Sequence, residues 1–327
     1  MLSTPKSVER PLQAPHNGYI GVGVARPDAR RLLQGRGRYV DDIRLPRMAH
    51  VAFVRSPYAH ARIVSIDVSD AAVSPGVIRV VSGSEVAGIC SPWVGVMTNR
   101  KGLKSAPQHA LAVDRACWQG EAVAAVAAET RVQAENAAQL INVEWQELVA
   151  LTDPETALDP HTPVLHPELG DNLAFQCEVD TGDIEKTFAA AYKIVEATFR
   201  TGRHTAVPLE PRSILADFNP AERQLTVYQA TQVPYMMQWI LAKHFELPEV
   251  NVRVIAPDVG GSFGAKIHVY GDEMTAVALS IMLGRPVKFV ADRLESFVTD
   301  IHARGHRVNA RMAVSQAGDI LGIDIDD

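Results

Sequence analysis

The sequence predicts an α+β fold in two domains. Strand-like and helix-like patterns alternate along the whole chain, and residues 122–145 follow the order strand, helix, strand, which is typical of a helix packed on a sheet. The length of 327 residues favours two domains at roughly 150 residues per domain. A proline-rich stretch over 151–172 separates the two halves and predicts a linker, because proline disfavours both helices and central strands.

The first half opens with short strands. Residues 49–54 are an apolar run that ends at an Arg-Ser-Pro turn signal. Val64, Ile66 and Val68 alternate with polar residues, which is the period of a half-buried strand. A turn at Pro75-Gly76 then leads into an expected strand over 77–81.

Residues 122–145 carry the clearest secondary-structure pattern in the sequence. Residues 122–128 predict a buried strand, and Thr130 is placed to cap the helix that follows. One face of this helix is apolar and consists of Ala134, Ala137, Ala138 and Ile141. The chain is expected to return as a strand at 143–145.

The second half repeats the alternation. We expect helices after Asp183, from Pro234 to Pro248, and over 274–281 with a stop at Gly284. The expected strands cover 195–199, 225–229, 252–255, 287–290 and 308–325. The strand pattern stops at Ile325 without a cap, so the second domain is expected to be incomplete.

Composition excludes several classes of protein. The net charge of −6 and the balanced 21% of charged residues argue against a disordered chain and against a nucleic-acid partner. No segment reaches the ~18–20 apolar residues of a membrane span. Three separated cysteines (Cys90, Cys117, Cys177) provide no cluster motif and indicate buried free thiols in a reducing compartment. Residues 1–17 lack the apolar stretch of a secretory signal, so we expect a cytoplasmic protein with a loose arm over residues 1–20.

A glycine-rich segment at 260–266 is the main candidate for chemistry. Glycines after a strand allow backbone N–H groups to approach a polar or anionic ligand. The spacing fits neither a phosphate-binding loop, which needs Gly-Lys-Ser/Thr, nor a dinucleotide fingerprint, which needs GxGxxG opening a helix. From the residues alone, a ligand-binding loop and a plain turn remain equal alternatives.

Weaker candidates are also present. His302 and His306 have the spacing of a helical metal pair, but Gly305 lies between them and no third ligand is evident. A polar cluster of His204, Glu210 and Arg212 could line a site or form a satisfied ion pair. The arginine run over 26–38 is interpreted as a solvated face or a subunit contact.

Six motifs resemble, in order, those of the molybdenum-binding large subunit of the xanthine dehydrogenase, aldehyde oxidase and carbon monoxide dehydrogenase family. They are residues 33–43 (LQGRGRYVDDI), 55–63 (RSPYAHARI), 119–124 (QGEAVA), 209–212 (LEPR), 231–234 (TQVP) and 258–266 (DVGGSFGAK). The resemblance implies an a/b hammerhead domain over 21–150. It also implies the first part of a molybdopterin cofactor-binding domain over 173–327, after the 151–172 linker.

The resemblance further implies molybdenum hydroxylase chemistry on an aldehyde, an N-heterocycle or carbon monoxide, with water as the oxygen source. The implied cofactor is molybdenum-molybdopterin in its cytosine dinucleotide form, with no direct protein ligand to the metal. Gln232 corresponds to the family glutamine whose amide reaches an oxygen of the metal centre, and is the expected catalytic residue. The expected cofactor-binding residues are Gln232, Gly261, Ser262, Phe263 and Gly264.

The implied partners are the remaining molybdopterin domain or subunit, a [2Fe–2S] subunit, an FAD subunit and a small-molecule substrate. Departures from the family pattern are also visible: Ser262 stands at a family glycine, and Ile267 replaces the glutamate of purine-oxidising members. Family large subunits are roughly twice this length, so the chain by itself is expected to be inactive. The alternative is a non-catalytic remnant that keeps the hammerhead fold as an assembly or binding module.

Overall fold

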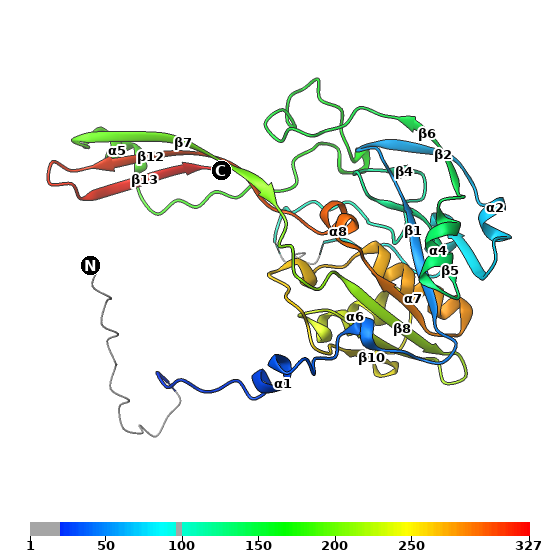
Figure 1. Ribbon diagram of the computed structural model, residues 1–327. Coiled ribbons are helices and arrows are strands. Elements are labelled where there is room, and N and C mark those ends of the chain that lie inside the picture. The colour runs from blue at the N-terminus through cyan, green and yellow to red at the C-terminus, as the bar shows by residue number, and fades with distance from the viewer. Residues whose placement is uncertain (1–19, 96–99) are drawn as a thin grey trace, which may run out of the picture. The chain divides into compact units, whose positions relative to one another are not determined.

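The computed structural model describes residues 20–95 and 100–327 (Figure 1). The expected arm over 1–20 lies outside the described residues apart from Ile20. The chain divides into two units, Met1–Arg38 and Tyr39–Asp327. The first unit contains the short helix α1 (Ala29–Leu33), and the second contains all the other elements described below.

A seven-stranded sheet is the centre of the second unit. Its strand order is β10-β9-β8-β11-β1-β5-β3. Its strands are β1 (Ala49–Arg55), β3 (Val77–Ser82), β5 (Ala122–Ala128), β8 (Ser213–Asn219), β9 (Gln224–Gln229), β10 (Val252–Ile255) and β11 (Val287–Val290). The parallel pairing of β1 with β11, with Ala49 opposite Val287, joins strands from the first half of the chain to strands from the second.

Strand β5 explains why helices cover both faces of this sheet. All seven of its residues are buried, and residues 124–127 alternate between two separate apolar clusters. Ala125 and Ala127 belong to the larger cluster, which includes residues of helices α6 (Pro234–His244) and α7 (Gly271–Leu283). Ala124 and Val126 share the other cluster with Ala137 of helix α4 (Arg131–Ala138). A strand with a continuous apolar run is typical of a sheet that is buried on both faces.

The remaining elements surround the sheet. The helices of this unit are α2 (Ser69–Ala72), α3 (Gly83–Ala87), α4 (Arg131–Ala138), α5 (Ile184–Ala189), α6 (Pro234–His244), α7 (Gly271–Leu283) and α8 (Arg293–Thr299). The 3₁₀ turns are η1 (Val40–Asp42), η2 (Pro167–Leu169), η3 (Glu249–Asn251) and η4 (Ala265–Ile267). A second sheet has the order β4-β2-β6, with β2 (Ala61–Asp67), β4 (Arg115–Ala116) and β6 (Asn142–Glu147). Within the described ranges, no helix combines the length and the apolar character that a bilayer crossing requires.

A third sheet forms an arm that projects from the body (Figure 1). It consists of β7 (Lys193–His204), β12 (Ala303–Val314) and β13 (Ile320–Asp326), in the order β13-β12-β7. Helix α5 covers one face of the arm, where Arg311 is paired with Glu196 and Asp324 and lies over the ring of Phe188.

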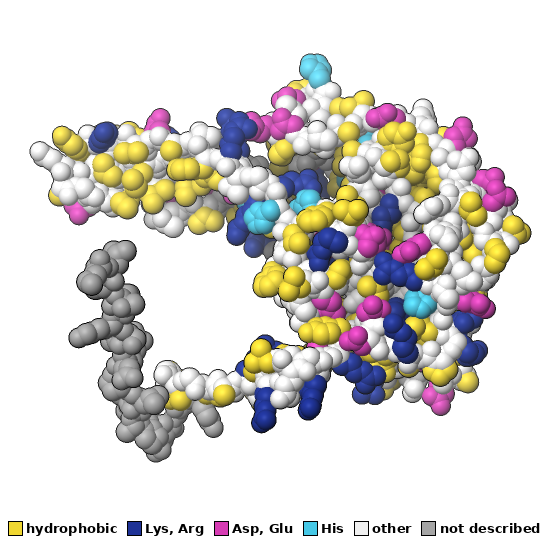
Figure 2. Space-filling view, in the orientation of Figure 1, with side chains coloured by type: hydrophobic (Ala, Val, Ile, Leu, Met, Phe, Trp, Pro, Cys, Tyr) yellow, Lys and Arg dark blue, Asp and Glu magenta, His cyan; other side chains and the backbone are white. Residues whose placement is uncertain are grey.

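The opposite face of the arm is apolar and exposed. The register places on this face the residues Val195, Ala197, Phe199, Val308, Ala310, Met312, Ile323 and Ile325. The side chain of Phe199 is 58% exposed and that of Ile325 is 62% exposed. Figure 2 shows hydrophobic side chains gathered along the arm. A contiguous apolar face of this kind is typical of a surface that is covered by further protein.

Most of the expected elements are present, and their local signals work as predicted. Thr130 accepts a hydrogen bond from the Gln133 N–H at 3.3 Å, and Asp183 accepts one from the Lys186 N–H at 3.0 Å. Gly284 adopts the left-handed conformation, with φ of 56°, that ends α7. The expected end of α6 at Pro248 is wrong, because the helix stops at His244 and the chain reverses at Glu246 with a positive φ of 51°. The expected burial of all three cysteines is also wrong, because Cys90 is buried but Cys117 is partly exposed and Cys177 is exposed.

The linker region contributes no strand to any sheet, and η2 is the regular element within residues 151–172. We therefore predict that limited proteolysis cleaves first within this stretch, and that the two fragments stay together on gel filtration. They should remain associated because the β1–β11 pairing and the larger apolar cluster join them. Separation of the fragments in native buffer would contradict the shared sheet.

The apolar face of the arm also makes a testable prediction. We expect the chain expressed alone to self-associate, and the substitution Phe199→Glu to reduce this self-association by placing a charge on the apolar face. The matched control is Thr198→Glu on the neighbouring position of β7, whose side chain lies on the opposite face and bonds Asn309. Light scattering measures both variants, and equal behaviour of the two would contradict the assignment.

Candidate functional site

The glycine-rich segment forms a strained loop between β10 and α7. Three of its residues have a positive φ: Gly261 (97°), Phe263 (51°) and Gly264 (92°). Glycine adopts this conformation freely, but a bulky aromatic residue does so only where the surrounding structure enforces it. The Phe263 side chain is 79% exposed, so apolar packing does not compensate for the strain. Strain of this kind is typical of functional loops.

Gln232 is connected to this loop through both its backbone and its side chain. The Gln232 N–H donates to the Lys266 carbonyl at 3.2 Å, and the Lys266 N–H donates to Ser262 Oγ at 3.1 Å. The Ser262 hydroxyl in turn donates to Gln232 Oε1. The structure thus brings together two expected site residues, Gln232 and Ser262, that are 30 positions apart in sequence.

An ion pair between Glu210 and Lys266 holds the loop from the protein interior. Lys266 Nζ lies 2.8 Å from Glu210 Oε2, and its side chain is 1% exposed. The same carboxylate oxygen accepts the Gly260 N–H at 2.7 Å. Burial lowers the pKa of Lys266, while the bond to Glu210 opposes this shift. The Lys266 charge is therefore turned into the protein, where it holds the loop and does not face a ligand.

The loop leaves several hydrogen-bond donors available. Within the described ranges, no acceptor is found for the N–H groups of residues 261–264 or for Gln232 Nε2. Successive backbone N–H groups in a tight loop can form a concavity that binds anionic or electron-rich oxygen atoms. The arrangement therefore fits a ligand that presents oxygen acceptors, and it offers that ligand uncharged donors.

A buried ionic cluster lies beside the loop and is centred on Arg212. Its guanidinium makes a bidentate pair with Asp272 at 2.6 and 2.8 Å and bonds Asp300 at 2.6 Å. The Tyr270 ring lies 3.8 Å from its central carbon. Arg212 holds the pKa of Asp272 well below its usual range, against the opposing effect of burial. The ion-pair interpretation of Arg212 is thus the one that the structure supports.

The other candidates are not brought together. His204 lies at the end of β7, and within the described residues it makes no side-chain contact with Glu210 or Arg212, which have separate partners. The helical spacing considered for His302 and His306 is wrong, because the chain enters strand β12 between them. His302 contacts Arg203 and His306 contacts Asp327. In the described part of the chain, no group of three His, Cys, Asp or Glu residues could hold a metal ion.

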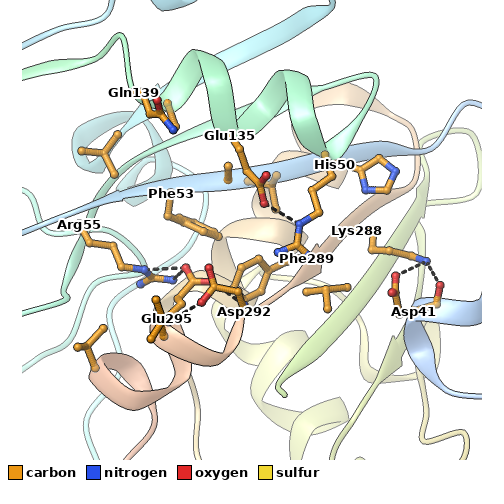
Figure 3. Close-up of a pocket in the computed structure, with 18 of the residues that line it drawn as sticks. Asp41, His50, Phe53, Arg55, Glu135, Gln139, Lys288, Phe289, Asp292 and Glu295 are labelled. Carbon is orange, nitrogen blue, oxygen red and sulfur yellow. Dashed lines mark hydrogen bonds and ion pairs between the residues drawn. The ribbon is translucent and has the colours of Figure 1, made fainter. Parts of the chain in front are cut away.

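A cleft of about 880 Å³ lies elsewhere, between α4 and α8 (Figure 3). Charged side chains along it have partners within the protein: Arg55 pairs with Glu295 and Arg131 with Glu135, and the Lys288 ammonium donates to the backbone carbonyls of Asp41 and Ile43. None of the residues that line it belongs to the Gln232 loop. Since its charges are satisfied by one another, this cleft offers fewer free binding groups than the loop.

Sequence reasoning missed the partners that support the site. Asp272 and Asp300 are 60 and 88 residues from Arg212, and Lys266 is 56 residues from Glu210. No local pattern predicts such long-range pairs. The available signal was the acidic pair Asp272-Glu273 at the start of an otherwise apolar helix, since buried carboxylates need a cationic partner.

Comparisons with known proteins agree with the resemblance seen in the sequence. The sequence model of the "Aldehyde oxidase and xanthine dehydrogenase, a/b hammerhead domain" matches residues 34–149, and that of the "Molybdopterin cofactor-binding domain" matches residues 165–327. The large subunit of nicotine 6-hydroxylase from Paenarthrobacter nicotinovorans is 35% identical over 304 residues, covering 93% of this chain and 37% of the relative.

Two further relatives extend this result. The carbon monoxide dehydrogenase large chain of Afipia carboxidovorans is 34% identical over 317 residues, which is 93% of this chain and 38% of that one. The crystal structure of quinoline 2-oxidoreductase from Pseudomonas putida 86 superposes with a TM-score of 0.88 at 39% identity, covering 92% of this chain and 38% of that chain. The chain therefore spans less than two fifths of the length of these relatives.

The Arg212 cluster predicts a pH-dependent effect of Glu273→Gln. Burial raises the pKa of Glu273 from 4.5 to about 7. Between these values the folded protein holds a proton that the unfolded chain has lost, so the wild-type stability falls as pH rises through this window. Glutamine does not titrate, and we expect the melting temperature of the variant, relative to wild type, to rise between about pH 5 and about pH 8.

The neighbouring substitution Asp272→Asn is the control. Asp272 is ionised and paired with Arg212 and Arg55, so removing its charge should destabilise the protein by about 3–5 kcal/mol throughout this pH range. Thermal unfolding at a series of pH values measures both variants. A pH-independent difference between Glu273→Gln and wild type would contradict the protonation of Glu273.

Proposed function

The chain belongs to the family of molybdenum-binding large subunits that includes the xanthine, aldehyde and carbon monoxide oxidising enzymes, and from this premise we propose that it forms part of a molybdenum hydroxylase. One observation carries the proposal. The loop over 261–264 and the Gln232 amide offer uncharged donors without acceptors among the described residues, within the domain matched to molybdopterin-binding proteins.

The residues present fit a molybdenum-molybdopterin cofactor. When bound, this group supplies the two-electron oxidation of a substrate with water as the source of oxygen. The loop N–H groups and the Gln232 amide would hold its oxygen atoms with neutral donors, which bind without adding charge to the centre. Gln232, Gly261, Ser262, Phe263 and Gly264 would make up this chain's side of the site.

Phe263 has a different role in this proposal. Its exposed ring carries no donor, and we assign it to the wall that excludes water from the substrate. Excluding water strengthens the hydrogen bonds of Gln232, because electrostatic interactions gain strength in a low dielectric. Ile267 lies beside this segment and is 36% exposed. An apolar side chain there favours an aldehyde, an N-heterocycle or carbon monoxide over a purine that would need a charged partner.

We propose that the working protein includes further polypeptides. The relatives named above are more than twice as long as this chain, and the apolar face of the arm is where the remaining molybdopterin-binding polypeptide would pack. A [2Fe–2S] subunit and an FAD subunit would accept the electrons. The cytosine dinucleotide form of the cofactor and a cytoplasmic location are part of the same proposal, and the three unpaired cysteines favour a reducing compartment.

Substitution of Gln232 tests this proposal. Removing a preorganised donor costs about 10²–10³ in turnover, or roughly 3–4 kcal/mol. We expect Gln232→Ala to lose that much in the complete enzyme, and Gln232→Glu to lose at least as much, because a carboxylate repels an electron-rich oxygen. Turnover is compared at equal molybdenum content, together with the melting temperature, which should change far less.

The control variant is Gln224→Glu, the same substitution at an exposed position of β9 outside the loop. It should leave turnover at the wild-type level. Near-normal turnover of Gln232→Glu at full metal occupancy would remove Gln232 from the reaction.

A further inference from the structure

A closed ring of hydrogen bonds joins Gln232 to the loop. It runs from the Gln232 N–H to the Lys266 carbonyl at 3.2 Å, from the Lys266 N–H to Ser262 Oγ at 3.1 Å, and from the Ser262 hydroxyl back to Gln232 Oε1. The ring fixes the main chain and the side-chain amide of Gln232 at once. A glutamine held only at its backbone would leave the amide free to turn.

The donors and acceptors in this ring determine which end of the amide is used. Ser262 Oγ already accepts the Lys266 N–H, and in the described part of the chain its own proton has no acceptor other than Gln232 Oε1. With Oε1 engaged by Ser262, Nε2 is the end of the amide that remains for a ligand. Turning the amide over would remove the acceptor of the serine proton and present an oxygen to the ligand.

We infer that Ser262 is a positioning residue: its hydroxyl selects the orientation in which Gln232 offers a donor. The inference rests on the proposed function, and it concerns the position where this chain departs from the family glycine. A glycine there provides no side chain that could hold the amide.

The frame that holds Ser262 is rigid and buried. Lys266 supplies both the carbonyl that accepts the Gln232 N–H and the N–H that donates to Ser262. Its ammonium is fixed by Glu210 at 2.8 Å, and its carbonyl also accepts the Thr231 hydroxyl at 3.1 Å. The serine hydroxyl is therefore set by groups that belong to the protein interior, and it does not depend on the ligand for its place.

A double-mutant cycle tests this role in the complete, cofactor-loaded enzyme. A single hydrogen bond changes a population by about tenfold, and an amide without it divides between its two orientations. We expect Ser262→Ala to lower kcat about twofold at equal molybdenum content, and Ser262→Thr, which keeps the hydroxyl, to restore most of it. In the Gln232→Ala background, Ser262→Ala should cause no further loss, because the amide is already absent.

A second readout does not depend on turnover. In the protein without bound cofactor, Ser262→Ala should lower the melting temperature by about 2 °C, and by less in the Gln232→Ala background. Because Ser262 also accepts the Lys266 N–H, a purely structural role would produce equal losses in both backgrounds. The cycle thus separates positioning of the amide from support of the loop.

The outcomes of these experiments distinguish a failure of the positioning role of Ser262 from a failure of the proposed function. Wild-type kcat in Ser262→Ala, or equal losses in both backgrounds, overturns the positioning role while the proposed function stands. Normal turnover of Gln232→Ala overturns the proposed role of Gln232. The melting temperatures of the same variants then test the contact between Ser262 and Gln232 without any measurement of turnover. Equal losses of melting temperature from Ser262→Ala in both backgrounds would overturn the positioning role of Ser262.

Discussion

The arrangement of the site depends on one buried guanidinium, that of Arg212. Its side chain is 1% exposed and bridges Asp272 at the start of α7 to Asp300 just after α8. Asp272 also binds Arg55 of β1 at 2.9 Å, so the same carboxylate connects the cluster to the first half of the chain. Burying such charges is costly, and removing one partner leaves an uncompensated ion. The cluster is therefore maintained as a unit, and it fixes the elements that flank the loop.

The cluster reaches the loop through Tyr270. The Tyr270 ring lies against Arg212, while its hydroxyl donates to the Ala265 carbonyl at 2.6 Å and accepts the Ile301 N–H at 3.2 Å. The left-handed backbone at Phe263 and Gly264 is held between this contact and the Glu210–Lys266 pair. The charges of Arg212 and Lys266 are thus paired with carboxylates inside the protein, and the donors of Gln232 and of the 261–264 loop are uncharged. This separation suits a site that orients a cofactor without altering its charge.

Local patterns predicted much of the fold, since the caps at Thr130 and Asp183 and the glycine after α7 act through neighbouring residues. The sequence patterns did not predict strand β8 or helix α8. The four N-terminal residues of β8 are all buried, without the alternation of a half-exposed strand, and α8 is seven residues long. The pairing of β1 with β11 links residues more than 230 positions apart, and no local pattern encodes it. For the site, the motifs located Gln232 and the loop, but the contacts of Ser262, Lys266 and Arg212 required the fold.

We propose that Gln232 and the 261–264 loop hold a molybdenum cofactor. The most direct measurement is metal analysis of the purified native complex, combined with anomalous diffraction at the molybdenum absorption edge. We expect about one molybdenum per copy of this chain and an anomalous peak beside Gln232 and the loop. A complete complex without molybdenum, or with its peak away from Gln232, would show that these residues do not hold the cofactor.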